Sequence, residues 1–489
     1  MDYKKIKKIH FTGIKGVGMT PLAIIAKEAG FKVTGSDVSD VFITDKELNK
    51  AGIEKIEECT ESNVEGVDLV IATAAHGGSE NIEVLRAKEL GISVLNQGQA
   101  LGAFQKGEIF GKKLKGISIS GSHGKTTTTA MTATVFENAG LKPSYVIGTS
   151  DIPSLGSSGH YGRGDFFITE SDEYFADIIS DKVPKFLYQN PEILVVTNID
   201  FDHPDIYGSL EEIKKVFVDF TKRIAPSGVL IACGDGVDNR DFLKRVDARK
   251  ITYGSSPDND YVLERVSSSP DKMFFWVKSH NASLGQFSMN VFGEQNAVNG
   301  LGAIVAGIEA GLTVEQIRHG LSQFKGTKRR SEFIGNLTSG GLLYDDYAHH
   351  PVEIKNTLAA FRKAFPKHKI IPIFQPHMYS RTKALFSEFS SSFSDADLVL
   401  VAEIFPSFRE KVDENFSSSL LVEEVKKFGK DAFYFPTLSD VVKYVTSKTF
   451  DKNTIIITMG AGDVYKIGKE ILILKEIENL QLGATKSFS

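Results

Sequence analysis

Short apolar runs alternate with longer segments of helical periodicity along almost the whole chain. This alternation is typical of α/β layers built on mostly parallel sheets. It falls into three blocks, and a chain of 489 residues has room for roughly three domains of ~150 residues each. We therefore predict an α/β protein with domains at residues 1–110, 111–328 and 329–489.

Each block has its own series of predicted strands and helices. In the first block we expect strands at residues 8–12, 31–35 and 68–73 and a helix at 19–29. In the second block we expect strands at 116–120, 166–169, 193–197 and 229–233, a β-rich insertion at 255–292 and helices at about 125–140 and 297–310. In the third block we expect strands at 342–344, 370–374, 398–402 and 455–459. From about Glu478 we expect a frayed tail.

Composition and charge exclude several classes of protein. The 57 Lys and Arg residues nearly balance 62 Asp and Glu, and a net charge of -5 argues against nucleic acid as the main partner. Cys59 and Cys233 are too few for a disulfide framework or a zinc site, which is typical of the cytoplasm. No apolar run approaches the ~20 residues that cross a bilayer, so we expect no membrane insertion. We expect a cytoplasmic monomer or homodimer.

A phosphate-binding loop follows the first strand of the second block. Such a loop aims backbone N–H groups at one point in front of a helix. Two glycines let the backbone approach the phosphates, Lys125 neutralises the β- and γ-phosphates, and Thr126 is placed to ligate Mg²⁺. Ile119 stands where the longer form of the motif has its first glycine. We predict ATP and Mg²⁺ as cofactors, with ATP contacts from Gly121, Ser122, His123, Gly124, Lys125, Thr126 and Thr127.

Acidic residues and a histidine follow two other strands of this block. Residues 170–173 read Glu-Ser-Asp-Glu, and residues 200–205 include three aspartates and His203. The carboxyl ends of parallel strands meet at one edge of a sheet, where ligands bind. Mg²⁺ prefers carboxylate and phosphate oxygens, and a second ion can take a carboxylate and an imidazole. Three such strand ends favour a metal–phosphate site over the alternative of helix caps and surface charges.

A glycine-rich turn in the first block suggests a second phosphate-bearing ligand. It lies between a strand and a helix, and Asp37 ends the next strand. The spacing departs from a dinucleotide fingerprint because Lys15 replaces the second glycine. A nucleotide sugar is the better interpretation, and a plain strand–helix turn is the alternative. The predicted contacts are Gly13, Lys15, Gly16, Val17, Gly18 and Asp37.

Polar residues also follow three strands of the third block, at 344–351, 374–382 and 460–463. The pair His349 and His350 could suggest a metal. Because no further ligands are suitably spaced, contacts to a substrate or a nucleotide are the better explanation.

Taken in order, these motifs resemble one family, the Mur ligases of peptidoglycan synthesis. The resemblance covers nearly the whole chain. It implies a Rossmann-like N-terminal domain for the UDP end of UDP-N-acetylmuramate, a P-loop ATPase central domain, and a Rossmann-like C-terminal domain that contacts the amino substrate and the nucleotide. The motifs that carry it lie at 13–19, 121–129, 170–173, 197–203, 296–299, 326–330, 345–351 and 375–382.

The resemblance also implies roles for individual residues. Thr126 and Glu170 hold one Mg²⁺, and His203 helps to hold a second. Lys125, Glu170, His203 and His349 form the catalytic set.

Three further residues contact ATP by the same resemblance, and one contacts the acceptor. Asn296 and Arg330 contact the nucleotide, and Asp346 contacts the ribose region. Arg381 lies with His349 near the incoming amino acid.

Within the family, two branches compete for the acceptor. Residues 375–382 look like the branch that joins L-alanine to UDP-N-acetylmuramate, whereas residues 170–191 look like the recycling branch that attaches a tripeptide. We give the third block more weight because the acceptor is selected there. The chain departs from the family at Lys15, where glycine is usual, and at Met378, where the alanine branch usually has arginine.

The implied chemistry begins with transfer of the γ-phosphoryl group of ATP to the carboxylate of UDP-N-acetylmuramate. The acyl phosphate is then attacked by the neutral amine. Two other classes of protein carry such a loop, a nucleotide-dependent switch or motor and a catalytically dead binding module. The first leaves the motifs of the outer blocks unexplained, and the intact Lys125, Thr126, Glu170 and His203 speak against the second.

Overall fold

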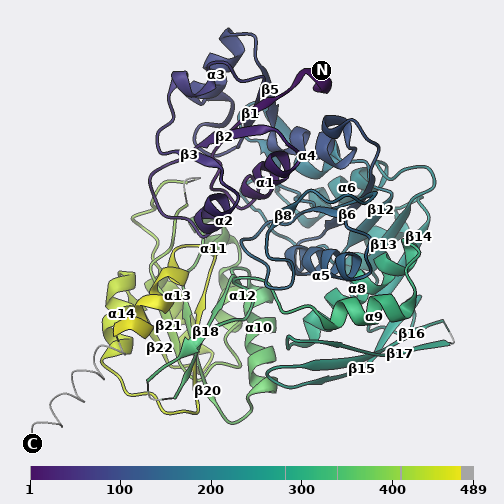
Figure 1. Ribbon diagram of the computed structural model, residues 1–489. Coiled ribbons are helices and arrows are strands. Elements are labelled where there is room, and N and C mark those ends of the chain that lie inside the picture. Colours follow the sequence, from purple (N-terminus) through teal and green to yellow (C-terminus); the bar gives the residue numbers. More distant parts are fainter. Residues whose placement is uncertain (1, 281, 339, 408–409, 475–489) are drawn as a thin grey trace, which may run out of the picture.

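The computed structural model describes residues 2–474 except 281, 339 and 408–409, and it contains three α/β domains (Figure 1). The N-terminal domain lies at the top of the view, the central domain at the right and the C-terminal domain at the lower left. The predicted α/β class and three-domain architecture are therefore confirmed. The tail predicted from Glu478 lies outside the described residues. None of the described helices is long and apolar enough to cross a membrane.

The N-terminal domain is built on a parallel sheet of order β3-β2-β1-β4-β5. The predicted strands and helix at 8–12, 19–29, 31–35 and 68–73 all form, with ends within one residue. The two short outer strands β3 and β5 escaped prediction because no residue in them is fully buried. The elements are β1 Lys8–Thr12, α1 Thr20–Glu28, β2 Lys32–Ser36, α2 Asp45–Lys50, β3 Glu54–Ile56, β4 Leu69–Ala72, α3 Ile82–Glu89, β5 Ser93–Asn96 and α4 Gln97–Gln105.

The central domain has a larger sheet of order β17-β16-β15-β14-β13-β12-β6-β9-β7-β8. Its middle is parallel, and the β-rich insertion predicted at 255–292 extends one edge as antiparallel strands. The elements are β6 Lys115–Ser120, α5 Lys125–Asn138, β7 Ser144–Val146, β8 Gly159–His160, β9 Phe166–Glu170, β12 Ile193–Val196, α6 Leu210–Thr221, β13 Val229–Cys233, α7 Val237–Lys244, β14 Lys250–Gly254, β15 Tyr261–Ser268, β16 Met273–Ser279, β17 Ala282–Met289, α8 Glu294–Glu309 and α9 Val314–Ser322. A separate hairpin pairs β10 Phe175–Asp177 with β11 Asp181–Pro184.

Both faces of the central sheet are buried, which explains the continuous apolar strands. Along β12, Ile193 and Val195 face the core beneath α5, α8 and α9. Leu194 and Val196 face a second core beneath α6 and α7. Because side chains alternate along a strand, the four apolar residues of β12 pack into both cores. This packing holds the carboxyl end of β12 at the edge of the sheet, where the polar residues follow.

The C-terminal domain has a sheet of order β18-β19-β23-β20-β21-β22, parallel except for β18. The four predicted strands are β19, β20, β21 and β23, whereas β18 and β22 were not predicted. The elements are β18 Glu332–Asn336, β19 Leu342–Asp346, α10 Pro351–Ala364, β20 Lys369–Phe374, α11 Tyr379–Ala384, α12 Phe386–Ser391, β21 Val399–Ala402, α13 Ser418–Lys427, β22 Ala432–Phe435, α14 Leu438–Thr446 and β23 Thr454–Met459.

The N-terminal and central domains share buried contacts. Val146 and Phe167 of the central domain complete the N-terminal core. Glu47 accepts a hydrogen bond from the backbone N–H of Ser158 at 2.9 Å, and both residues are buried. The C-terminal domain meets the central domain along the edge where β6 and β12 end, and the contacts there form the candidate site.

Candidate active site

The phosphate-binding loop connects β6 to α5, as the sequence predicts. Gly121 and Gly124 have φ angles of 131° and 82°, which side-chain-bearing residues rarely adopt. A Cβ atom on Gly121 would lie 2.1 Å from Thr197 Oγ1, and one on Gly124 would lie 2.5 Å from Asn299 Oδ1. Both positions therefore require glycine for backbone shape and for space.

The end of β12 holds this loop in place. Asn198 Oδ1 accepts from the backbone N–H of His123 at 2.9 Å, and Asn198 Nδ2 donates to the His123 carbonyl at 2.9 Å. The Ser122 N–H donates to the Asn198 carbonyl at 3.0 Å, and Ser122 Oγ accepts from the Asp200 N–H at 2.9 Å. These contacts hold the loop backbone in shape through the protein's own groups.

Lys125 makes an ion pair with the buried Glu173. Its Nζ lies 2.9 Å from both carboxylate oxygens and 3.4 Å from the Ser122 carbonyl. Burial alone would lower the pKa of Lys125, but Glu173 and Asp172 outweigh it and raise the pKa. The lysine is therefore charged, with its ammonium held beside the strand-end carboxylates.

Thr126 and Glu170 lie together at the start of α5, as expected of two ligands of one metal. Thr126 Oγ1 donates to Glu170 Oε1 at 3.0 Å, and the Gly148 N–H donates to Glu170 Oε2 at 2.9 Å. Burial raises the pKa of Glu170 despite the nearby Lys125. A hydroxyl and a buried carboxylate beside a phosphate loop are oxygen donors of the kind that Mg²⁺ takes, so these residues fit the ion.

His203 belongs to a second group with Asp172 and Glu173, whose ligand atoms all lie within 4.8 Å of one another. His203 Nε2 is 3.6 Å from Glu173 Oε1. In the described part of the chain, the buried Nδ1 of His203 has no hydrogen-bond partner. His203 also has a left-handed φ of 57°, which is uncommon outside glycine. Two carboxylates and an imidazole with an orphaned nitrogen fit a second cation.

A third group, His123, Asp200 and His350, is close enough for a metal, but the ring nitrogens of its two histidines already have partners. His350 Nε2 faces the Phe201 carbonyl at 3.2 Å, and its Nδ1 accepts from the Val352 N–H at 3.3 Å. Burial opposes protonation of His123, but Asp200 and Glu353 outweigh it and raise its pKa to about 9. His123 Nε2 lies 3.1 Å from Asp200 Oδ2 and His123 Nδ1 lies 3.5 Å from Glu353 Oε1, so both nitrogens are engaged and this group favours hydrogen bonding over metal ligation.

A cavity of about 610 Å³ lies between the central and C-terminal domains next to the phosphate loop. Asp346, at the end of β19, lines it and accepts from the Ser331 N–H at 2.7 Å and the Ala348 N–H at 2.8 Å. Burial raises the pKa of Asp346. The cavity brings together six of the residues predicted to bind ATP, namely His123, Gly124, Thr127, Asn296, Arg330 and Asp346.

His349 and Arg381, the predicted acceptor residues, lie at the interface between the central and C-terminal domains. Arg381 is buried, and its Nε and Nη2 donate to Asp202 Oδ1 at 3.1 and 2.8 Å. His349 Nδ1 is 3.0 Å from the Tyr347 carbonyl, and burial lowers the pKa of His349 to about 3. His349 is therefore neutral, and two nitrogens of the Arg381 guanidinium already have a carboxylate partner.

The glycine-rich turn of the N-terminal domain carries Gly16, Val17 and Gly18 at its more exposed positions. Lys15 does not face outward with them. Its N–H donates to Asp37 Oδ2 at 2.7 Å, and its Nζ donates to the carbonyls of Val38 and Asp40 at 2.7 and 3.0 Å. The side chain of Lys15 thus ties the turn to the loop after β2.

His76, from the loop after β4, lies against the same turn. Its Nε2 is 3.3 Å from Asp37 Oδ1, which raises the pKa of His76. Its Cδ2 lies 3.4 Å from the position of a Cβ on Gly13. Sequence reasoning missed His76, because a single histidine after a strand has no characteristic spacing.

Comparison with known proteins decides the family. Residues 8–108 match the model described as Mur ligase family, catalytic domain, residues 119–307 match the Mur ligase middle domain, and residues 329–462 match the Mur ligase, glutamate ligase domain. The UDP-N-acetylmuramate–L-alanine ligase of Desulfitobacterium hafniense is 38% identical over 467 residues, covering 95% of this chain and 99% of that protein. The chain belongs to the Mur ligase family. It is therefore an ATP-dependent ligase.

Solved structures of Mur ligases share this fold. The UDP-N-acetylmuramate-alanine ligase of Thermotoga maritima aligns with a TM-score of 0.78 at 26% identity, covering 97% of this chain and 99% of that chain. The murein peptide ligase of Psychrobacter arcticus aligns with a TM-score of 0.69 at 24% identity, covering 96% and 98%. At that identity the second likeness bears on the fold alone.

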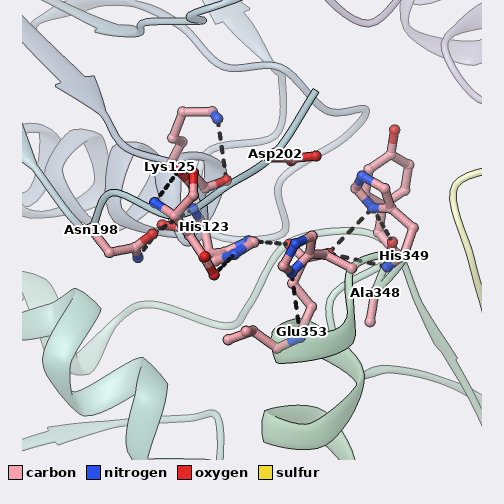
Figure 2. A network of polar contacts seen from close by, with 12 residues as sticks. His123, Lys125, Asn198, Asp202, Ala348, His349 and Glu353 are labelled. Atoms are coloured by element: carbon pink, nitrogen blue, oxygen red, sulfur yellow. Dashed lines mark hydrogen bonds and ion pairs between the residues drawn. The ribbon is translucent and has the colours of Figure 1, made fainter. Parts of the chain in front are cut away.

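Within this Mur ligase, sequence reasoning gave no role to three carboxylates, of which Glu173 and Asp202 are buried and Glu353 is 11% exposed. Glu173 pairs with Lys125, and Asp202 pairs with Arg381. Glu353, in the first turn of α10, lies between the phosphate loop and His349 (Figure 2). Glu173 and Asp202 belong to acidic motifs that follow strands. Such motifs indicate a site, but they do not show which basic residue each acid pairs with. Glu353 follows Pro351 at the start of a helix, where an acidic residue is expected for helix capping alone.

Proposed function

We propose that this Mur ligase joins L-alanine to the carboxylate of UDP-N-acetylmuramate in peptidoglycan precursor synthesis. The observation that carries the proposal is the near-full-length identity of 38% to a UDP-N-acetylmuramate–L-alanine ligase. The charged Lys125, the preformed phosphate loop and the cavity beside it supply the chemistry that such a ligase needs. The substrates are ATP, UDP-N-acetylmuramate and L-alanine.

The first step moves the γ-phosphoryl group of ATP to the sugar carboxylate and forms an acyl phosphate. In our proposal the backbone of Gly121, Ser122 and Gly124 cradles the phosphates, and Lys125 turns from Glu173 to the transferring group, where it stabilises the developing charge. Two Mg²⁺ ions would neutralise phosphate charge, one held by Thr126 and Glu170 and the other by His203.

The remaining nucleotide contacts come from both sides of the cavity. Thr127 and Asn296 would meet ATP from the central domain, and Arg330 and Asp346 from the C-terminal domain. Because both domains contribute, a closed arrangement would exclude the water that hydrolyses an acyl phosphate.

We propose that the UDP end of the sugar substrate binds the exposed face of the N-terminal turn. Gly13, Gly16, Val17 and Gly18 would contact it through the backbone. Lys15 and Asp37 would act indirectly, because their mutual hydrogen bond and the buried Lys15 ammonium shape the turn. His76 lies on the same side and would add a cationic contact to the diphosphate.

In the second step the neutral amine attacks the acyl carbon, the amide bond forms, and the bond to the phosphate breaks, so that inorganic phosphate leaves and the nitrogen loses a proton. We propose that His349 and Arg381 line the acceptor site. Arg381 would bind the alanine carboxylate with Nη1, which lies 3.4 Å from His377 Nδ1, since Asp202 accepts from its other two nitrogens. A neutral His349 avoids repelling an ammonium substrate that has to lose a proton.

A competition experiment tests the acceptor. The enzyme receives ATP, Mg²⁺ and UDP-N-acetylmuramate with L-alanine and the tripeptide L-Ala-γ-D-Glu-diaminopimelate at equal concentrations, and the products are weighed by mass spectrometry. We expect the L-alanine adduct to dominate. Dominance of the tripeptide adduct would establish the alternative, a murein peptide recycling ligase, and would mean that residues 170–191 outweigh the C-terminal domain in selecting the acceptor.

Three further features complete the proposal. We place the domain boundaries near residues 110 and 328, which lie between the last helix of one sheet and the first strand of the next. We expect a monomer or a homodimer, because one chain supplies every residue of the proposed site. A cytoplasmic location fits substrates such as ATP and two cysteines that are both free.

A further inference from the structure

Glu353 contacts three residues with separate roles in the proposed reaction. Its Oε1 lies 3.5 Å from His123 Nδ1 in the phosphate loop and 3.5 Å from Arg330 Nη1 beside the nucleotide cavity. Its Oε2 lies 3.3 Å from His349 Nδ1 and accepts from the His349 N–H at 3.1 Å. Figure 2 shows Glu353 at the start of α10 between His123 on one side and His349 on the other.

Helix capping accounts for only one of these contacts. The bond from the His349 N–H stabilises the start of α10, as acidic side chains in a first turn do. Capping requires neither the burial of a full charge nor the two cationic partners on the opposite oxygen. Burial opposes ionisation of Glu353, yet His349, His123 and Arg330 hold its pKa well below the ordinary value. The carboxylate is therefore ionised and shared between the two sites.

Glu353 also selects the tautomer of His349. The Nδ1 atom of His349 faces two acceptors, the Tyr347 carbonyl at 3.0 Å and Glu353 Oε2 at 3.3 Å. A neutral histidine with acceptors at Nδ1 carries its proton there, which leaves a lone pair on Nε2. The lone pair is thus directed away from Glu353.

We propose that Glu353 is a positioning residue that couples occupancy of the nucleotide site to the acceptor site, an inference that rests on the proposed ligase function. Phosphate groups entering the loop attract His123 and Arg330, and that attraction draws both cations away from Glu353 Oε1. The carboxylate then interacts more strongly with His349 and holds its ring in one tautomer and orientation. Such coupling is reciprocal, so the acceptor must change the affinity for nucleotide by the same factor.

The decisive variant is Glu353→Gln. Glutamine keeps a carbonyl oxygen that can accept from the His349 N–H, so the helix cap persists. It loses the charge, and its amide group cannot satisfy both His349 Nδ1 and the two cations. Glu353→Asp keeps the charge on a shorter side chain and should restore part of the coupling.

The matched control is Glu294→Gln. Glu294, at the start of α8, forms an ion pair with Lys363 of α10, so it joins the same two domains. Both side chains are more than half exposed, and neither lines the cavity. This variant removes one interdomain carboxylate charge and leaves the site intact.

The experiment measures the dissociation constant of ADP by calorimetry in the presence of Mg²⁺ and UDP-N-acetylmuramate, with and without saturating L-alanine. We expect the wild type and Glu294→Gln to show a change of about fivefold or more between the two conditions. We expect the ratio in Glu353→Gln to fall to nearly one. Steady-state kinetics should show higher KM values for ATP and L-alanine in Glu353→Gln and an unchanged KM for UDP-N-acetylmuramate.

Two results would overturn the inference. A wild-type ratio of one would mean that the two sites are independent. A Glu353→Gln protein that loses activity but keeps the wild-type ratio would mean that Glu353 only caps the helix. Product analysis of the wild type by mass spectrometry separates these results from failure of the proposed function, and if it identifies the tripeptide as acceptor, the titration is performed with the tripeptide.

Discussion

The ion pair between Lys125 and Glu173 shows how the charges of single residues in this site compensate one another. The glutamate neutralises the lysine, and it also lies 3.6 Å from His203. A phosphate would replace the carboxylate as the partner of Lys125. The exchange retains most of the charge compensation, so the lysine can move without leaving an isolated charge in the protein interior.

Lys125→Ala should lose ligation almost completely and keep the fold. Removal of a group that stabilises transferring charge typically costs ~10²-fold or more in rate. The loop backbone is held by Asn198, so its shape should persist, although the unpaired Glu173 should lower the melting temperature. The checks are product formation and thermal unfolding. Lys185→Ala is the control, since it removes a lysine that pairs with Asp172 in the same cluster, and equal losses in both variants would refute the assignment.

Glu170→Ala and His203→Ala should each raise the Mg²⁺ concentration needed for activity. Each substitution removes one proposed ligand, which weakens the binding of one Mg²⁺, although the phosphates of the nucleotide still contribute to holding that ion. Titrations of activity against Mg²⁺ should shift to higher concentration by roughly tenfold or more, as for loss of a metal contact.

The control for the metal experiment is Asp205→Ala. Asp205 follows the same strand as His203, but its carboxylate accepts from the Tyr174 hydroxyl at 2.6 Å. Its Mg²⁺ curve should remain at the wild-type position. If the curves of Glu170→Ala and His203→Ala also coincide with the wild type, both residues are structural.

At the scale of elements, the sequence predicted what apolar pattern determines and missed what tertiary contacts determine. The strands β12, β13 and β23 are largely apolar runs because both faces of their sheets are covered, and each was predicted within two residues. The edge strand β22 is also hydrophobic, but it is short and partly exposed, and it was not predicted. The polar residues at strand ends were found because parallel strands bring their carboxyl ends to one edge.

The pairings within the site could not be predicted from the sequence. Glu353 belongs to α10 and His123 to the loop before α5, and only the packing of two domains brings them together. Arg381 was predicted to bind a substrate carboxylate, but no periodicity reveals that Asp202, 179 residues earlier, accepts from it. Such contacts depend on how domains meet, and short-range patterns carry no information about that.

The contact between His123 and its two carboxylates predicts a pH dependence of stability. The pKa of His123 is about 9 in the folded protein, against an ordinary value of 6.5. A raised folded-state pKa means that the stabilisation is complete below about pH 6.5 and is lost as the pH rises through about 9. Each unit of pKa difference corresponds to about 1.4 kcal/mol. Unfolding by denaturant should therefore show that the free energy of unfolding falls more between pH 6 and pH 9.5 in the wild type than in His123→Gln.

The difference between the two proteins isolates His123. The pKa values of His76, His160 and His203 are also raised, so these residues also lower the free energy of unfolding as the pH rises. Because all three remain in the variant, their contributions cancel when the two proteins are compared. Equal losses in both proteins over this pH range would show that the loop and α10 are not joined by a protonated His123.

At the scale of the whole molecule, the C-terminal domain meets the central domain through ion pairs of two kinds. Glu294 and Lys363 form an exposed pair, and exposed pairs contribute ~0–1 kcal/mol. Asp202 and Arg381 form a pair in which both side chains are less than one tenth exposed. Loss of one partner from a buried pair typically costs ~3–5 kcal/mol, because the other charge is left in the interior without compensation. The buried pair should therefore dominate the closed arrangement of the domains.

Asp202→Asn should accordingly loosen the closed arrangement, whereas Glu294→Gln should not. Burial opposes ionisation of Asp202, but His203 and Arg381 hold its pKa well below the ordinary value, so the wild-type residue is a carboxylate and asparagine removes a full charge. The Arg381 guanidinium, left without a charged partner, is then more stable in water than in the interface. The helix that carries it, α11, should therefore exchange its amide hydrogens faster. The KM for L-alanine should rise by about tenfold or more, since the guanidinium that would bind its carboxylate is no longer held in place.

Hydrogen exchange followed by mass spectrometry and steady-state kinetics measure the two effects. If exchange in α11 is the same in Asp202→Asn and Glu294→Gln, the domains are held together by their apolar contacts and the buried pair serves only to orient Arg381.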